Sequence, residues 1–207
     1  MEPTDKQWRI GFFFDFVSPY SYLAFHRIGE IAAHSGCAVD YQAVDLAELK
    51  RRAGNTGPAT RQIPVKLRYA RTDIERWARR YGVTLVSPTS NRPMRANRGL
   101  ALARREGRTM AYMTSAWAHG WRLGQDLSED ATLRAIADES GIHSDRLLAW
   151  VDSEEAIEIL AAATDAAANA GLFGVPTMTC GDEMWWGNDR LDFLQEHLAV
   201  QAVSAAR

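Results

Sequence analysis

Cysteine is scarce in this chain of 207 residues, which contains only Cys37 and Cys180. Two thiols so far apart in sequence form no C-x-x-C redox pair and no disulfide framework, and we interpret both as small buried hydrophobic residues. The five histidines show neither the H-E-x-x-H nor the H-x-x-x-H spacing. No metal site built from protein ligands is therefore predicted.

Long apolar runs and an excess of one charge are also missing. No apolar run approaches the roughly 18 residues of a membrane-spanning helix, and the first ten residues, MEPTDKQWRI, lack the apolar centre of a secretory signal. The formal net charge of -2 argues against a general partner role for nucleic acid or anionic membranes. We therefore expect a cytoplasmic protein with neither as partner, and the 46% hydrophobic content fits a globular core.

The first 45 residues have the pattern of a β-α-β unit. Residues 8–16 are dense in aromatic and apolar side chains, which predicts a buried strand. Ser18-Pro19 then opens a helix that runs to about residue 35 and ends at Gly36. The alternating stretch CAVDYQAVDL predicts a second strand. Such a unit normally gives a parallel pair of strands.

Between about residues 45 and 165 the pattern is helical. TDIERWARRYG places Ile74, Trp77, Ala78 and Tyr81 on one face and ends at Gly82. SEDATLRAIADESG predicts another helix, with Ser128 as its N-cap and Gly141 as its end.

A strand pattern returns after Gly171. VPTMTC and MWWG, joined by a tight turn, predict a hairpin, and NDRLDFLQEHLAV predicts a final helix capped by Asn188 or Asp189. The whole order predicts an α/β protein, a thioredoxin-like fold with a large all-helical insertion. Residues 1–45 and 153–207 are assigned to the thioredoxin-like domain, and residues 46–152 to the helical insertion domain.

Ser18 lies at a strand-to-helix junction, where thioredoxin-like redox proteins carry C-x-x-C. Here the four positions read Ser18-Pro19-Tyr20-Ser21. A serine at the positive end of a helix can donate a hydrogen bond to an anion, such as the thiolate of a ligand. The alternative is that Ser18 only caps the helix, and spacing alone favours the cap. Ser21 is interpreted as a structural hydroxyl.

Two further positions have a functional and a structural interpretation. Pro176, in GVPT, is either a cis-proline that leaves the Val175 backbone free to pair with an extended ligand, or an ordinary edge-strand proline. Lys50, taken by itself, is a solvated helix lysine.

Four segments together resemble one known family. FFFDFVSPYSYLA, VDLAELKRRAGNTGP, VKLRYARTDIERWARRYG and FGVPTMTCGDEMWWGNDRLDFL are similar to the 2-hydroxychromene-2-carboxylate isomerases. These are glutathione-dependent enzymes of bacterial aromatic degradation, related to kappa-class glutathione transferases and DsbA-like oxidoreductases. The resemblance runs from about Trp8 to about Leu198 and implies a homodimer that acts on a small aromatic carboxylate.

The resemblance also implies roles for individual residues. Ser18 matches the active-site serine that contacts the glutathione sulfur, and Val175 with Pro176 matches the segment that pairs with the cysteinyl unit. The γ-glutamyl end of glutathione is implied to bind the segment Trp186, Gly187, Asn188 and Asp189. An aspartate suits its ammonium group, and open N–H groups suit its carboxylate.

The implied substrate site consists of Lys50, Thr60, Arg61 and Asn91. Lys50 matches a family lysine that pairs with the substrate carboxylate. At Thr60 the family has an asparagine, and near Asn91 it has an aromatic residue. These two departures concern the identity of the substrate and leave the glutathione half of the site unchanged.

Three alternatives remain beside a glutathione-dependent isomerase. A kappa-class-like glutathione transferase or a glutathione-dependent lyase shares the cofactor site and differs in its product. A dithiol oxidoreductase is disfavoured because C-x-x-C is missing. A non-catalytic binding protein is disfavoured because Ser18, Lys50 and WWGND are all present.

Overall fold

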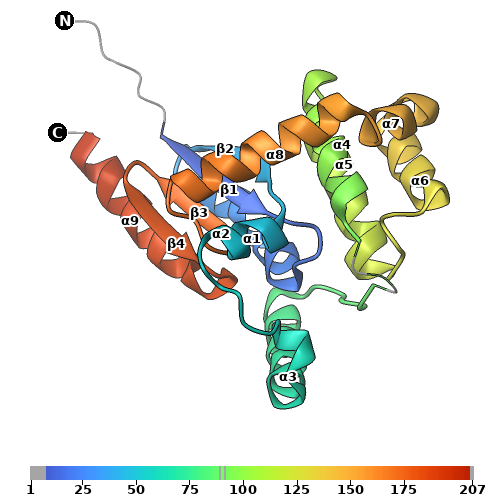
Figure 1. Ribbon diagram of the computed structural model, residues 1–207. Helices are drawn as coiled ribbons and strands as arrows, with labels where there is room; N and C mark the ends of the chain where they lie inside the picture. Colours follow the sequence, from blue (N-terminus) through green and yellow to red (C-terminus); the bar gives the residue numbers. More distant parts are fainter. Residues whose placement is uncertain (1–7, 89, 91, 206–207) are drawn as a thin grey trace, which may run out of the picture.

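The computed structural model describes residues 8–88, 90 and 92–205 (Figure 1). Its first unit comprises β1 (Arg9–Phe14), α1 (Pro19–His34) and β2 (Ala38–Ala43). The two strands are parallel, as predicted, with Arg9 opposite Ala38 and Phe14 opposite Ala43. Strand β1 ends two residues earlier than expected, because residues 15–18 form the turn that leads into α1.

The predicted hairpin near the C-terminus completes a four-stranded mixed sheet. Strands β3 (Thr177–Cys180) and β4 (Glu183–Trp186) are antiparallel, and β3 also pairs with β1. The strand order is therefore β2-β1-β3-β4. Helix α8 (Glu154–Asn169) leads into the hairpin, and α9 (Leu191–Ala205) follows it.

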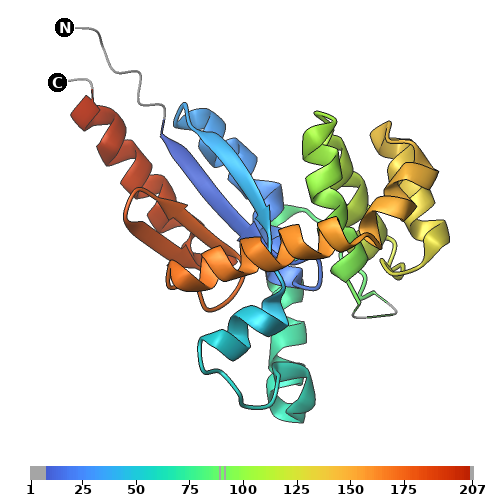
Figure 2. The same cartoon turned by 45° about the horizontal axis from the view of Figure 1, so that its top comes forward.

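Strand β1 sends alternate side chains to opposite faces of the sheet, as the two-residue period of a strand requires. Phe12 and Phe14 are fully buried on the face covered by α1 and α9. Phe13 points the other way and packs with a second cluster that includes Leu49 and Ala167, from the helices α2 (Leu46–Arg52) and α8. Figure 2 shows α8 crossing the sheet on this second side. The sheet is thus covered by helices on both faces.

The remaining helices lie between α2 and α8 in sequence. They are η1 (Thr60–Gln62), α3 (Pro64–Tyr81), α4 (Met94–Arg105), α5 (Thr109–Trp117), the π-helical turn η2 (Ala118–Arg122), α6 (Asp130–Ser140) and α7 (Ser144–Val151). Figure 1 shows α4 to α7 as a lobe beside the sheet and α3 as an arm that extends from the body. The thioredoxin-like fold with a helical insertion is confirmed.

One continuous cluster of buried side chains joins the sheet to the helical lobe. Phe16, just after β1, packs edge-on against Trp117 of α5 with ring centroids 4.5 Å apart. The same cluster extends to Leu133 of α6 and Leu147 of α7. The division of the chain into domains 1–45 with 153–207 and 46–152 stays a prediction, and the two parts share this core.

The predicted helix ends are partly right. Gly82 and Gly141 end α3 and α6 in the left-handed conformation, with φ of 66° and 71°. Ser128 as the cap of α6 was wrong: Glu129 is the N-cap residue, and the backbone N–H and hydroxyl of Ser128 both donate to Asp126. The final helix also differs, because a short 3₁₀ turn, η3 (Asn188–Arg190), precedes α9.

Both cysteines are free thiols, but only Cys180 is buried as expected, whereas Cys37 is half-buried. Across the part of the chain that the structure describes, no helix combines the length and the apolar character needed to cross a bilayer. The same residues contain no group of three or more His, Cys, Asp or Glu side chains arranged to hold a metal ion.

Gly99 gives a test of the packing inside the lobe. A Cβ at this position of α4 would lie 2.1 Å from the Oη atom of Tyr112, which is fully buried and donates to the Ala96 carbonyl. We expect Gly99→Ala to lower the free energy of unfolding by about 2 kcal/mol, because overpacking outweighs the gain in helix propensity. Urea unfolding measures this change.

The matched control is Gly29→Ala in the exposed interior of α1, where an added Cβ meets no atom within 4 Å. Helix propensity alone then acts, and we expect a stabilisation of up to about 1 kcal/mol. Equal effects of the two substitutions would contradict the tight packing at Gly99.

Candidate active site

Ser18 is the N-cap residue of α1. Its hydroxyl oxygen accepts a hydrogen bond from the Ser21 N–H at 3.2 Å, and its own N–H donates to the Asp15 carbonyl at 2.9 Å. The capping role is therefore confirmed. Within the described residues the Ser18 hydroxyl donates no hydrogen bond, so its hydrogen remains available to a ligand. The side chain is buried, which favours short, well-directed contacts.

The segment that precedes β3 is open along its backbone. The Val175–Pro176 peptide bond is cis, and β3 lies inside the sheet order, so the edge-strand interpretation of Pro176 was wrong. Among the described residues Val175 makes no backbone hydrogen bond. The Pro176 carbonyl accepts from the Gly187 N–H at 2.9 Å, which ties this segment to the one after β4.

The predicted γ-glutamyl segment combines buried and exposed groups. Gly187 adopts φ of 105°, a region that favours glycine, and a Cβ there would lie 2.5 Å from Asp189 Oδ1. Asn188 is buried and its Nδ2 has no hydrogen-bond partner among the described residues. Asp189 is partly exposed and pairs with Arg190 at 2.7 Å. Trp186 is 52% exposed and packs edge-on against Phe173.

The start of α1 lies close to this segment. Helix α1 packs against η3, which carries Asn188 and Asp189. Tyr20, two residues after Ser18, donates from its Oη to Asp73 of α3 at 3.0 Å. Burial is the main cause that raises the pKa of the Tyr20 hydroxyl. The nearby carboxylates of Asp73 and Asp189 raise this pKa further. The structure thus brings the first turn of α1, η3 and α3 together.

Three of the four predicted substrate residues lie on α2 and on the turn η1, which precede the arm in sequence. Lys50, on α2, is half-buried and makes no ion pair with the described residues, whereas its neighbour Arg51 pairs with Glu48. Thr60 and Arg61 belong to the exposed turn η1, and among the described residues no hydrogen bond or ion pair joins them to Ser18. Asn91 lies outside the described residues. The structure therefore groups the glutathione residues more closely than the substrate residues.

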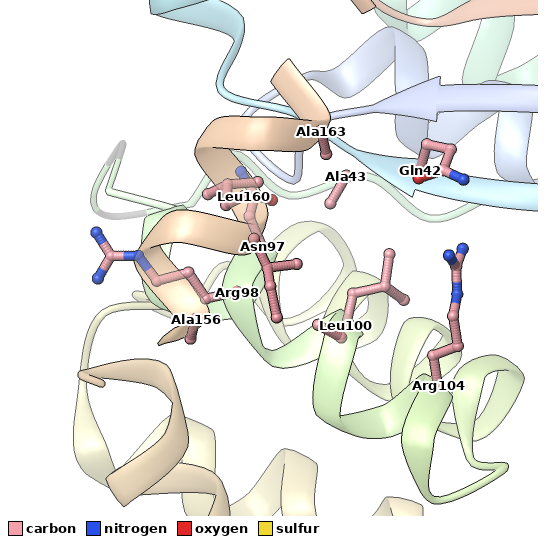
Figure 3. Close-up of a pocket in the computed structure, with 11 residues that line it drawn as sticks. Gln42, Ala43, Asn97, Arg98, Leu100, Arg104, Ala156, Leu160 and Ala163 are labelled. Atoms are coloured by element: carbon pink, nitrogen blue, oxygen red, sulfur yellow. The ribbon is translucent and has the colours of Figure 1, made fainter. Parts of the chain in front are cut away.

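Two hollows lie near Asp15. A cleft of about 10 Å³ is lined by residues that include Val17, Pro88 and Ser90, so the segment after α3 comes close to the Ser18 turn. A larger cavity of about 50 Å³ lies between β2, α4 and α8 (Figure 3). Its lining is mostly apolar, from residues such as Leu100 and Leu160, and contains none of the predicted site residues. The larger cavity is thus not the candidate site.

Sequence reasoning missed two residues that hold the turn before Ser18. Asp15 is buried, and it accepts from the Val17 N–H at 2.9 Å, from the Leu46 N–H at 3.0 Å and from Asn97 Nδ2 at 2.9 Å. Asn97 Oδ1 in turn accepts from the Phe16 N–H at 3.1 Å. A carboxylate at the end of an apolar aromatic run was a visible signal for Asp15. Nothing in the local sequence marked Asn97.

Comparison with known proteins shows which family the chain is similar to. Residues 9–199 match the model of the DSBA-like thioredoxin domain. The chain is 37% identical over 189 residues to a 2-hydroxychromene-2-carboxylate isomerase of Sphingobium xenophagum, covering 91% of this chain and 97% of that protein.

A solved structure of a 2-hydroxychromene-2-carboxylate isomerase is similar with a TM-score of 0.91 at 36% identity, over 96% of this chain and 98% of the other. A more distant relative is the kappa 1 glutathione S-transferase of Rattus norvegicus, 25% identical over 88% of this chain and 87% of that protein.

The Tyr20–Asp73 contact predicts how the arm is held. We expect Tyr20→Phe to lower the free energy of unfolding by about 1 kcal/mol, the usual value of one hydrogen bond, and to speed amide hydrogen exchange in α3. Tyr69→Phe is the control, because Tyr69 is 65% exposed. Unchanged exchange in α3 of the Tyr20→Phe variant would show that other contacts hold the arm.

Proposed function

The chain belongs to the 2-hydroxychromene-2-carboxylate isomerases, a family with the DSBA-like thioredoxin fold, and we propose that it works with glutathione. The proposed reaction is the cis-trans isomerisation of 2-hydroxychromene-2-carboxylate, or a close aromatic analogue, to trans-o-hydroxybenzylidenepyruvate. The observation that carries the proposal is Ser18, a buried hydroxyl with an unused hydrogen at the N-terminus of α1.

The open backbone and polar side chains of the site fit glutathione. The Val175 backbone is open to a peptide-like ligand, as the cysteinyl unit requires. The unpartnered Asn188 Nδ2 suits the γ-glutamyl carboxylate, and the Asp189 carboxylate suits its ammonium group. The segment after α3 also approaches the Ser18 turn, so a substrate placed there would lie next to the sulfur.

When bound, glutathione would supply a nucleophilic thiolate for reversible addition to the conjugated substrate. Ser18 donates its hydroxyl hydrogen toward the sulfur position, and the positive end of α1 favours negative charge there. Val175 and Pro176 fix the direction of the backbone. Lys50 binds the carboxylate of the aromatic acid. Neither cysteine takes part, since burial raises the pKa of both the Cys37 and Cys180 thiols.

A kappa-class-like glutathione transferase or a glutathione-dependent lyase is the second candidate, favoured by the likeness to the rat kappa enzyme. The two candidates differ in the fate of glutathione. An isomerase leaves its concentration unchanged, whereas a transferase consumes it and accumulates a conjugate. Mass spectrometry of the reaction mixture separates them.

The metabolic pathway, the location in the cell and the oligomeric state are also proposals. We place the enzyme in bacterial aromatic-hydrocarbon degradation of the naphthalene type, in the cytoplasm and as a homodimer. Light scattering after size-exclusion chromatography would test the dimer.

Substitution of Ser18 tests the proposed role. We expect Ser18→Ala to lower glutathione-dependent turnover by about 100-fold, as removal of a donor to a reacting anion typically does, and to cost about 1 kcal/mol of stability through the lost cap. Ultraviolet absorbance follows the isomerisation, and urea unfolding measures the stability.

Ser153→Ala is the matched control. Ser153 caps α8 through the same kind of bond, with the Ala156 N–H at 3.2 Å from its hydroxyl oxygen, but it belongs to none of the site segments. The Ser153 hydroxyl also donates to the Trp150 carbonyl at 2.7 Å, so we expect a stability loss at least as large, with normal turnover. Normal turnover in Ser18→Ala as well would remove Ser18 from the mechanism.

Lys50→Met tests the carboxylate contact. We expect KM for the aromatic acid to rise roughly 10- to 100-fold, because a hydrogen bond to a charged group contributes about 1.5 to 3 kcal/mol, while glutathione affinity is unchanged. The control is Arg51→Met, which removes a neighbouring charge that is already paired with Glu48. If both variants raise KM alike, Lys50 acts only through the general charge of α2.

A further inference from the structure

The turn between β1 and Ser18 is held by hydrogen bonds from residues that lie outside the turn. The Asp15 carboxylate receives N–H groups from three places: Val17 within the turn, Leu46 at the start of α2, and Asn97 on α4. Phe16 is fixed at both backbone groups, since its N–H donates to Asn97 Oδ1 and its carbonyl accepts from Trp121 Nε1 at 2.7 Å. The Ser18 N–H closes the turn on the Asp15 carbonyl.

All three hydrogen bonds to the Asp15 side chain are donated to it by N–H groups. Its Oδ1 accepts two hydrogen bonds and its Oδ2 accepts one. A protonated carboxyl carries a hydrogen that needs an acceptor, and the oxygen that bears it is a weaker acceptor for its facing N–H group. Asn97 cannot compensate by reversing its amide, because its oxygen is already needed by the Phe16 N–H. Protonation of Asp15 therefore leaves its hydrogen without an acceptor among these groups and weakens the bonds that hold the turn.

We propose that Asp15 and Asn97 are positioning residues for Ser18, and that the turn keeps its working geometry only while the Asp15 carboxylate is ionised. The link to activity rests on the proposed function, whereas the link between Asp15 charge and turn geometry does not. The consequence is a loss of catalytic efficiency on the acid side, caused by displacement of Ser18 rather than by glutathione itself.

The surroundings of Asp15 set the pH range. Burial is the largest influence and raises the pKa of Asp15 to about 6, against the lowering effect of its hydrogen bonds. The groups that face the turn from α2, α4 and η2 are Asp45, Asn97 and Trp121, and Thr164 of α8 accepts from the Asp45 N–H. Only Asp45 among these is charged, and its carboxylate raises the pKa of Asp15 further.

Stability and activity should respond to pH in opposite directions. A buried acid with a raised pKa stabilises the fold most when protonated, so its contribution is present below about pH 4 and is lost as pH rises through about 6. Activity should instead rise over the same window as the turn forms its bonds. A residue that acted only on stability would not produce this opposition.

Two variants move the pKa of Asp15 in opposite senses. Asn97→Ala removes a hydrogen bond that lowers the pKa, so the acid limb of kcat/KM should move to higher pH. Efficiency at the optimum should also drop roughly tenfold or more, because small displacements of a reacting group can cost up to about 100-fold. Asp45→Asn keeps the cap of α2 but removes a charge that raises the pKa, so the limb should move to lower pH.

Two further variants are Asp15→Asn and a control substitution that lies away from the turn. Asp15→Asn should give low efficiency that does not change between pH 5 and 7, and its urea midpoint should lack the wild-type fall over that range. Asp138→Asn, at an exposed position of α6, should leave both profiles as in the wild type. If Asp15→Asn does not fold, the opposite shifts of the other two variants still decide the proposal.

A measurement on the ligand-free protein separates this proposal from the proposed function. Carbon-13 NMR follows the Asp15 carboxyl, and amide hydrogen exchange follows the N–H groups of Val17, Ser18 and Leu46. We expect these amides to lose protection as Asp15 takes up its proton, whether or not the enzyme isomerises the expected substrate. Protection that is independent of the Asp15 charge, or an acid limb that neither Asn97→Ala nor Asp45→Asn shifts, would overturn the proposal.

Discussion

The buried Asp15 carboxylate is the point on which three parts of the molecule depend. It accepts N–H groups from its own turn, from α2 and from α4, 82 residues away through Asn97. Burying a charge is costly unless hydrogen bonds replace its hydration, and here they come from backbone and amide groups instead of a cation. The arrangement fixes the sheet, α2 and the helical lobe relative to Ser18, the N-cap of α1.

A thioredoxin-like frame without a thiol at the start of α1 keeps the physical properties of that position and changes its chemistry. The helix start still favours negative charge, and the cis-proline segment still presents an open backbone. Replacing the cysteine by Ser18 removes the nucleophile but leaves a hydrogen-bond donor. We propose that the frame is then suited to a thiolate that arrives with a ligand. The chain is similar both to isomerases and to a kappa-class transferase, and it has the DSBA-like thioredoxin fold.

The helical insertion joins the frame in two different ways. The lobe is fused to it by apolar packing, because Phe16 and Trp117 lie in one continuous core. The arm touches it mainly through polar and aromatic contacts, including Tyr20 with Asp73 and Arg27 over the ring of Tyr81. Only Ala78 of α3 is buried. The lobe therefore holds the Ser18 turn through the core, whereas the arm is less firmly held. Lys50 lies on α2, which packs on the other face of the sheet through Leu49.

Local signals determined much of this protein by themselves. Ser18-Pro19 and Gly36 bound α1, Gly82 and Gly141 end later helices, and the short apolar runs around residues 177–186 form the hairpin, because caps and turns depend on neighbouring residues. The resemblance of several motifs supplied the family and the candidate site. Only the tertiary structure decided the strand order, the interior position of β3 after Pro176, and the choice of Glu129 over Ser128 as a cap. The tertiary structure also paired Asp15 with Asn97. This hydrogen bond spans 82 residues and is fixed by how the lobe packs on the sheet, so it leaves no periodic pattern in the sequence.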